Sequence, residues 1–158
     1  MYDQITYSLV NDLQTKELMT DEILHSLPDW FGIEAAIRMY MKEVQDTEKP
    51  FHTAYDDKRH IGLISLKNNY STTTDIFLMA VLKEYHRKGI GKELINWAKG
   101  YCLENKKKLL IVKTLSERHP DKNYTKTRLF YKGQGFFEFE ENLEMWNGIP
   151  CLILAHVI

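Results

Sequence analysis

One uninterrupted apolar run, residues 76–82, constrains the fold more than any other part of the chain. It belongs to a segment, residues 73–82, that does not alternate between apolar and polar positions, which predicts a strand buried on both faces of a sheet. Apolar positions at helical spacing follow over residues 89–105, and another apolar run covers residues 109–115. A strand–helix–strand unit predicts two parallel strands joined by a right-handed crossover. The sequence therefore favours a mixed α/β fold.

The rest of the chain supplies mainly strands that suit antiparallel pairing. Residues 51–55 and 61–67 flank the turn Asp56–Arg59 and predict a hairpin. The expected strands are 2–10, 51–55, 61–67, 73–82, 109–115, 136–139 and 145–157, the last interrupted by Gly148 and Pro150; the expected helices are 13–27, 33–44, 89–105 and 124–132. We expect a mostly antiparallel sheet with a central parallel pair, in the order β-α-α-β-β-β-α-β-α-β-β.

Composition limits the domain count and the class of protein. With 158 residues, 44% of them hydrophobic, the chain suits one domain spanning residues 1–158. The two cysteines, Cys102 and Cys151, exclude a disulfide framework, and no Cys/His cluster suggests a metal site. No segment approaches the roughly 20 apolar residues of a membrane helix, and the first residues do not resemble a secretory signal. We expect a cytoplasmic protein without metal.

Positive charge is concentrated in one segment, although the formal net charge is only −1. Residues 1–80 contain 13 acidic and 7 basic residues, whereas the 14 basic residues of the second half all lie between Lys83 and Lys132, opposed there by 5 acidic ones. Such a segment predicts an anionic partner. We do not expect nucleic acid, because the basic residues alternate with apolar core positions and no aromatic residues interleave with them for base stacking.

The junction between the apolar strand and the following helix is the strongest candidate site for that anion. It contains His86, Arg87, Lys88, Gly89, Ile90, Gly91 and Lys92. The N–H groups at a helix N-terminus bind phosphate, and glycines allow close approach of the backbone. The spacing does not fit a Walker A loop or a dinucleotide fingerprint. The alternative interpretation is a glycine-containing turn with solvated lysines.

Two motifs that follow one another along the chain resemble those of the GCN5-related N-acetyltransferases (GNAT), which move an acetyl group from acetyl-CoA to an amine. The family motif Gln/Arg-x-x-Gly-x-Gly/Ala is similar to the segment His86-Arg-Lys-Gly89-Ile-Gly91, with histidine at its first position. The family segment Asn-x-x-Ala-x-x-Phe-Tyr-x-x-x-Gly-Phe is similar to residues 124–136, where Phe130, Tyr131, Gly135 and Phe136 match while Tyr124 replaces the asparagine and Thr127 the alanine. The resemblance covers residues 73–137 best.

The resemblance implies roles for individual residues. Asp75 lies where histone-type members have a glutamate general base, although a carboxylate at a strand end can also cap the loop before it. Met79, Ala80 and Val81 would offer main-chain N–H groups to the cofactor, with Met79 polarising the thioester carbonyl. Tyr131 would protonate the CoA thiolate, unless it is a core tyrosine. The family also implies that residues 86–92 and Tyr124 contact acetyl-CoA.

The resemblance also suggests an acceptor side and an activity. Trp30 and Phe31 follow Pro28 in a loop that shapes the acceptor pocket in the family, although both side chains could equally anchor the core. The implied activity is that of an acetyl-CoA-dependent N-acetyltransferase, an acyltransferase that transfers groups other than aminoacyl, acting on a small-molecule or peptide amine by direct attack in a ternary complex. A cationic amine would suit the acidic first half. The alternative is an acyl-CoA sensor without turnover, and a homodimer is left open.

Overall fold

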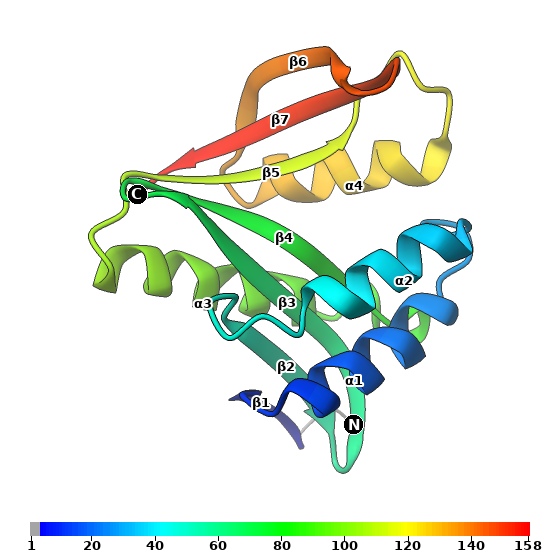
Figure 1. The fold of residues 1–158 in the computed structure, drawn as a ribbon, viewed down its shortest axis with the longest axis vertical. Coiled ribbons are helices and arrows are strands. Elements are labelled where there is room, and N and C mark those ends of the chain that lie inside the picture. Colours follow the sequence, from blue (N-terminus) through cyan, green and yellow to red (C-terminus); the bar gives the residue numbers. More distant parts are fainter. Residues whose placement is uncertain (1–3) are drawn as a thin grey trace.

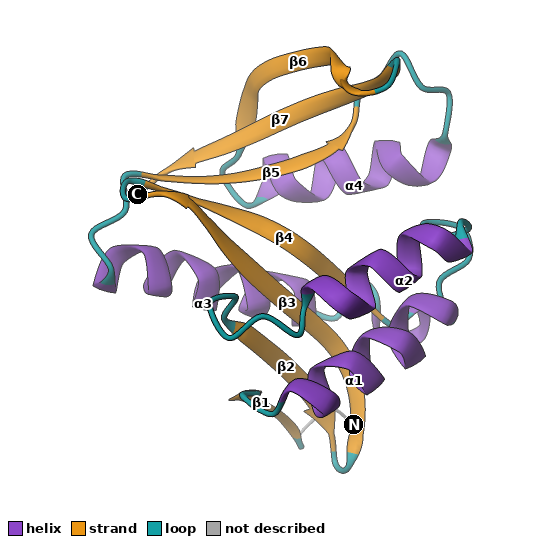
Figure 2. Ribbon diagram, in the orientation of Figure 1, coloured by secondary structure: helices purple, strands orange, loops and turns teal. Residues whose placement is uncertain are grey.

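The computed structural model describes residues 4–158 as one mixed sheet covered on both faces by helices (Figure 2). The strands follow the order β1-β2-β3-β4-β5-β7-β6 across the sheet. In Figure 1, α1 and α2 lie in front of the sheet, while α3 and α4 lie behind it. The elements are β1 (Ile5–Leu9), α1 (Leu13–His25), α2 (Glu34–Glu43), β2 (Phe51–Asp56), β3 (Arg59–Tyr70), β4 (Thr73–Val81), the 3₁₀ helix η1 (Lys83–Tyr85), α3 (Ile90–Glu104), β5 (Leu109–Leu115), α4 (Lys122–Gly133), β6 (Phe137–Trp146) and β7 (Ile149–Val157).

The main core lies between the sheet and its helices. Helix α1 begins at the cap Asp12, whose side chain accepts a hydrogen bond from the Thr15 N–H at 2.9 Å. Its apolar face, which includes Met19, Ile23 and Leu24, is fully buried, and the helix contacts β3 and β4. None of the helices within the described residues is long and apolar enough to cross a membrane. The apolar face fixes α1 on one side of β3 and β4.

Strands β4 and β5 pair over only part of their length. They are parallel, as expected, and their register runs from Thr73 opposite Leu109 to Ile76 opposite Val112. Beyond Ile76, β4 keeps its antiparallel partner β3, and β5 keeps β7. Figure 1 shows the two strands starting together and diverging towards their carboxyl ends. The second half of β4 therefore has an unpaired edge in the middle of the sheet.

The predicted element order is confirmed, and the largest error concerns the C-terminal strands. Residues 145 and 146 belong to β6, and the hairpin turn lies at Asn147 and Gly148, which have φ values of 53° and 87°. The expected strand 145–157 was therefore wrong, because an Asn-Gly pair with two positive φ values is a hairpin turn rather than an interruption of one strand. Helix α4 also begins earlier than predicted, because the Asp121 side chain accepts from the Asn123 N–H and caps it. Residues 2 and 3 of the expected first strand lie outside the described residues.

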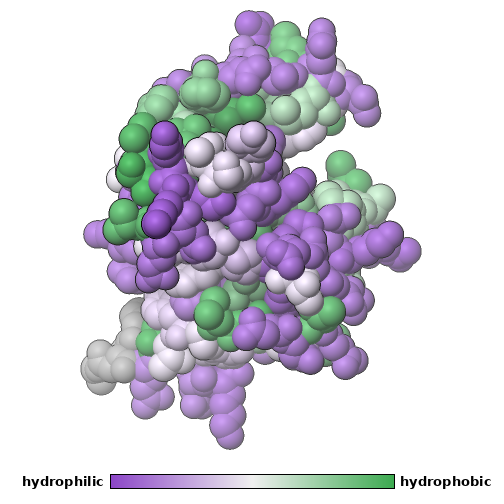
Figure 3. Space-filling view, turned by 60° about the vertical axis from the view of Figure 1, so that its left-hand side comes forward, coloured by the Kyte–Doolittle hydropathy of each residue, from purple (hydrophilic) through white to green (hydrophobic). Residues whose placement is uncertain are grey.

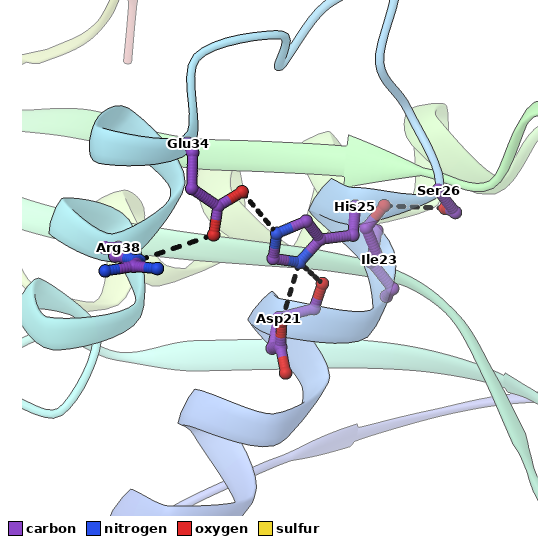
Figure 4. A network of polar contacts seen from close by, with 6 residues as sticks. All are labelled: Asp21, Ile23, His25, Ser26, Glu34 and Arg38. Carbon is purple, nitrogen blue, oxygen red and sulfur yellow. Dashed lines mark hydrogen bonds and ion pairs between the residues drawn. The ribbon is translucent and has the colours of Figure 1, made fainter.

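A polar network joins the end of α1 to the start of α2 and holds the loop between them (Figure 4). His25 Nε2 lies 2.8 Å from Glu34 Oε2, and His25 Nδ1 lies 2.6 Å from Asp21 Oδ1. Glu34 also contacts the Arg38 guanidinium at 3.4 Å. The hydrogen bond to Glu34, followed by that to the Asp21 carbonyl, raises the pKa of His25 above its usual value. The network should therefore be strongest when the imidazole is charged.

We expect this network to make stability pH-dependent. Because the folded pKa of His25 is raised, its contribution is fully present below the unfolded pKa of about 6.5 and is lost as pH rises through the folded value. The melting temperature of the wild type should exceed that of His25→Gln at pH 6, and the difference should shrink by pH 9. Glu34→Gln, which removes the main partner, should show the same loss. A difference that stays constant from pH 6 to pH 9 would contradict this role.

Candidate active site

The loop between β4 and α3 leaves the N-terminus of α3 without a side-chain cap. Gly89 occupies the cap position with φ 83° and makes no side-chain capping hydrogen bond. The first N–H groups of an uncapped helix are free to bind an anion, and the helix dipole favours negative charge there. The side chains of Arg87, Lys88 and Lys92 are exposed around this end, whereas Ile90 is buried in the core. The turn thus has the local properties of a phosphate site.

Two contacts hold the start of this loop. The Tyr85 hydroxyl donates to Asp56 at 2.5 Å, and Arg59 pairs with Glu84 at 2.8 Å, so η1 is fastened to the β2–β3 hairpin. His86 turns inwards instead of outwards: its Nε2 lies 2.7 Å from the Val81 carbonyl oxygen, and its ring meets Trp30 edge to face at 5.4 Å. The histidine that departs from the family motif therefore shapes the loop.

Gly91 lies against α4. A Cβ at Gly91 would come within 2.9 Å of the Phe130 ring and 3.8 Å of the Met79 Cε. Gly91 thus permits the close approach of α3, α4 and β4, whereas Gly89 has no atom within 4 Å of an added Cβ and owes its identity to its positive φ. The two glycines of the motif serve different physical needs.

This difference predicts different consequences for two alanine variants. Gly89→Ala should destabilise the fold by about 1–2 kcal/mol through backbone strain alone, which corresponds to a melting temperature lower by roughly 2–8 °C. Gly91→Ala should destabilise it by displacing the Phe130 ring. The measurement is thermal unfolding of each variant with and without Phe130→Leu. The stability losses of Phe130→Leu and Gly89→Ala should add, whereas Phe130→Leu should offset part of the stability loss of Gly91→Ala. Additive losses in both double variants would contradict a packing role for Gly91.

The unpaired edge of β4 points main-chain groups into the gap between β4 and β5. The Leu82 N–H donates to the Ile61 carbonyl oxygen, so Leu82 and Ile61 form a hydrogen-bonded pair. Alternation along the antiparallel ladder then directs the N–H and C=O groups of Met79 and Val81 away from β3. The contact between the Val81 carbonyl and His86 agrees with this direction. Ala80 lies between them and directs its N–H towards β3, so Met79 and Val81 offer the available amides.

Asp75 lies in the paired part of β4 and is only 5% exposed. Lys113 from β5 forms an ion pair with Asp75 Oδ2, and the Asn69 amide donates to the same oxygen at 3.3 Å. Within residues 4–158, the other carboxylate oxygen accepts no hydrogen bond. One oxygen of the Asp75 side chain therefore has no hydrogen-bond partner among residues 4–158, and neither oxygen bonds to the loop at residues 71–72.

Tyr131 lies in α4 with 5% of its surface exposed. It packs against the rings of Phe130 and Phe136 at centroid distances of 5.2 and 5.5 Å. Burial, together with the nearby Asp75 charge and Tyr40, holds the pKa of Tyr131 well above its usual value. Its hydroxyl makes no hydrogen bond to any group of residues 4–158 and is not fully enclosed, so solvent or a ligand can reach it. The hydroxyl is therefore a protonated donor without a partner of its own.

A small cavity of about 270 Å³ opens beside Asp75. Its walls come from five elements: Met39 and Tyr40 of α2, Lys67 of β3, Asp75, Ile76 and Phe77 of β4, Lys113 of β5, and Met145 and Trp146 of β6. Figure 3 shows a notch in the outline between the upper part of the molecule, which holds β6 and β7, and the lower part. Within the described residues, no group of three or more His, Cys, Asp or Glu side chains is arranged to hold a metal ion.

The structure places Trp30, Phe31 and Tyr124 around this site as well. The Tyr124 hydroxyl donates to the Trp30 carbonyl oxygen at 2.8 Å, so the loop after α1 is tied to α4. Phe31 meets Tyr40 edge to face at 6.0 Å, and Tyr40 in turn meets Phe77 at 5.5 Å. Trp30 and Phe31 are partly buried against the core and anchor the loop. Phe31 contacts Tyr40 of the cavity wall, whereas Trp30 contacts His86 of the β4–α3 loop. Tyr124 uses its hydroxyl for this anchor.

Apart from Asp75, the residues of the cavity were not predicted from the sequence; they include Tyr40, Lys67 and Lys113. Tyr40 fits the apolar face of a helix, and Lys113 follows an apolar run inside a basic segment, so neither carries a local signal. Only the parallel register, which sets Asp75 opposite Ile111, brings Lys113 near Asp75 across 38 residues of sequence. The registers of β3 and β5 against β4, taken together, would have found both lysines.

Comparisons with known proteins identify the family and agree with the fold. The family model described as "Acetyltransferase (GNAT) family" matches residues 16–136. A GNAT-family protein from Desulfovibrio desulfuricans superimposes with a TM-score of 0.83 at 17% identity, covering 97% of this chain and 98% of that one. A GNAT-family acetyltransferase from Elizabethkingia anophelis, solved with acetyl-CoA bound, gives 0.71 at 18% identity and 99% coverage of both chains. An aminoglycoside 6'-N-acetyltransferase complexed with coenzyme A gives 0.75 at 15% identity and 96% coverage of both. No curated protein matches the sequence.

Proposed function

Because the chain belongs to the GNAT acetyltransferase family, we propose that it transfers the acetyl group of acetyl-CoA to a primary amine by direct attack within a ternary complex. One observation carries this proposal: the unpaired amides of β4 lie between an uncapped helix N-terminus and two protonatable side chains, Asp75 and Tyr131. An anionic cofactor and a neutral amine can be brought together along that edge.

The residues of the loop would hold acetyl-CoA as co-substrate. The N–H groups at the start of α3 would bind the pyrophosphate, beside the open space at Gly89, while Gly91 lets α3 pack closely on α4. Arg87, Lys88 and Lys92 surround this end with positive charge. The bound cofactor supplies the activated acetyl group. The Met79 N–H, directed into the gap, would donate to the thioester carbonyl oxygen as negative charge develops on it.

The proton transfers would involve Asp75 and Tyr131. The free oxygen of Asp75 would accept a proton from the attacking amine, directly or through water, as the new carbon–nitrogen bond forms. The carbon–sulfur bond then breaks, and the departing thiolate would receive its proton, or a hydrogen bond in place of it, from the Tyr131 hydroxyl. Lys113 would keep the Asp75 carboxylate in position. Trp30 and Phe31 would border the acceptor side.

Two measurements test the proposal in sequence. Thermal unfolding with increasing acetyl-CoA should show a melting temperature that rises with cofactor concentration. Release of free thiol should then be followed with acetyl-CoA and a panel of primary amines. Stabilisation by acetyl-CoA with thiol release only at the rate without protein would support the non-catalytic sensor instead. Absence of stabilisation at millimolar acetyl-CoA would refute both interpretations.

A further inference from the structure

The cavity beside Asp75 holds more positive than negative charge. Lys67 lies directly opposite Asp75 in the β3–β4 register, and Ile111 of β5 lies opposite Asp75 on its other side. Lys113, two residues after Ile111, shares the face of Ile111 because side chains alternate along a strand. Three adjacent strands therefore place two lysines and one carboxylate around one small space.

The two lysines differ in what they contact. Lys113 is three-quarters buried and forms an ion pair with Asp75, so its charge is matched. Lys67 is exposed, lines the cavity, and makes no ion pair or hydrogen bond within residues 4–158. Its Cβ should lie about 4.5–5.5 Å from that of Asp75, because the two residues are paired directly across the ladder. The Lys67 ammonium is therefore available to a ligand that also reaches Asp75.

The remaining walls restrict the size and character of that ligand. Met39, Met145 and Trp146 provide apolar surface opposite the charged strands. The volume of about 270 Å³ is below the range of about 300–1,000 Å³ typical for drug-sized ligands. A small molecule fits this space better than a large polycation. Among the described acidic residues of the first half, only Asp75 lines the cavity, so the acidity of residues 1–80 does not create a cationic subsite.

We propose that the acceptor is a small amine that also carries a carboxylate, as an amino acid does. Its amine faces Asp75, its carboxylate pairs with Lys67, and its side chain packs on the apolar wall. The inference rests on the proposed acetyl transfer and specifies its substrate class. Polycationic acceptors are disfavoured, because a second positive charge would approach Lys67 and Lys113 without a carboxylate to receive it.

Matched substrate pairs test the proposal. Thiol release from acetyl-CoA is measured with free amino acids such as leucine, methionine and phenylalanine, with their carboxamides, and with a polyamine. We expect kcat/KM to be about tenfold to a hundredfold higher for the carboxylates than for the carboxamides, the range of one charge-assisted hydrogen bond. Each pair shares its side chain, and kcat/KM is compared per concentration of neutral amine because the carboxamide has the less basic amine. The ratio then reports the carboxylate.

Lys67→Met tests whether the Lys67 ammonium binds this carboxylate. It should raise KM for the amino acids about tenfold or more with little change in kcat, leave the carboxamides unaffected, and bring the ratio towards one. Lys58→Met, in the β2–β3 turn away from the cavity, removes an equal charge and should leave the ratio unchanged. Lys67→Glu should reverse the preference towards amines without a carboxylate.

The outcomes separate this inference from the proposed function. Faster acetylation of carboxamides or of the polyamine would overturn the acceptor class and still support acetyl transfer. A carboxylate preference that persists in Lys67→Met would overturn the role of Lys67. If acetyl-CoA stabilises the protein but none of the amines tested causes thiol release, both the acetyl transfer and the acceptor class would be overturned.

Discussion

Asp75→Asn should lower kcat by about a hundredfold or more, the usual loss when a general base is removed. The change keeps the shape of the side chain and its neighbour Asn69, but it removes the carboxylate that pairs with Lys113 and that would accept the proton of the amine. Binding of acetyl-CoA should change little, because the cofactor loop lies at the other end of β4. The measurement is kcat and KM by thiol release, with acetyl-CoA affinity followed by thermal shift.

The basicity of the acceptor distinguishes a base from a merely structural carboxylate. An amine with a low pKa is largely neutral at the assay pH and has less need of a general base. The loss of kcat caused by Asp75→Asn should therefore be smaller with such an acceptor. Asp57→Asn is the matched control, since Asp57 lies in the β2–β3 turn and asparagine tolerates its φ of 54°. Turnover of Asp75→Asn within about threefold of the wild type would exclude Asp75 as the base.

The strand–helix–strand unit could be predicted because its signals are local. The apolar run 76–82, the glycine turn and the helical spacing after it are each contained in a short window, and the expected strand 109–115 matches β5. The C-terminal hairpin is harder to predict, because Gly148 and Pro150 each resemble an interruption of a single strand. Asn147-Gly148 is itself a specific turn signal, and giving it priority would have placed the end of β6 correctly.

The chemistry of the candidate site depends on pairings that no local window contains. Asp75 and Tyr131 could be proposed from a family motif, but the partner Lys113 follows from the β4–β5 register and Lys67 from the β3–β4 register. The hydrogen bond from Tyr124 to Trp30 spans 94 residues. Charge summed along the sequence misleads for the same reason: the acidic half lines the cavity with only one carboxylate among its described residues, and two lysines face it.

Tyr131→Phe should lower kcat about a hundredfold and leave the affinity for acetyl-CoA nearly unchanged. The hydroxyl makes no hydrogen bond within residues 4–158, so its removal breaks no contact of the fold, and the ring keeps its packing against Phe130 and Phe136. Stability should therefore equal that of the wild type within about 0.5 kcal/mol. Because burial and the Asp75 charge raise the pKa of Tyr131, the phenol stays protonated across the working range.

That raised pKa also indicates how the hydroxyl acts. A phenol of high pKa donates a hydrogen bond to a thiolate, whose free pKa is near 8.5, more readily than it surrenders its proton. The effect should consequently appear in kcat and not in the position of the pH optimum, since Tyr131 does not titrate there. Tyr101→Phe, which removes an α3 hydroxyl that accepts a hydrogen bond from Asn68 of β3, is the matched control and should retain full turnover. Loss of turnover in Tyr131→Phe accompanied by an equal loss of acetyl-CoA affinity would instead indicate a structural tyrosine, and unchanged turnover would remove Tyr131 from the mechanism.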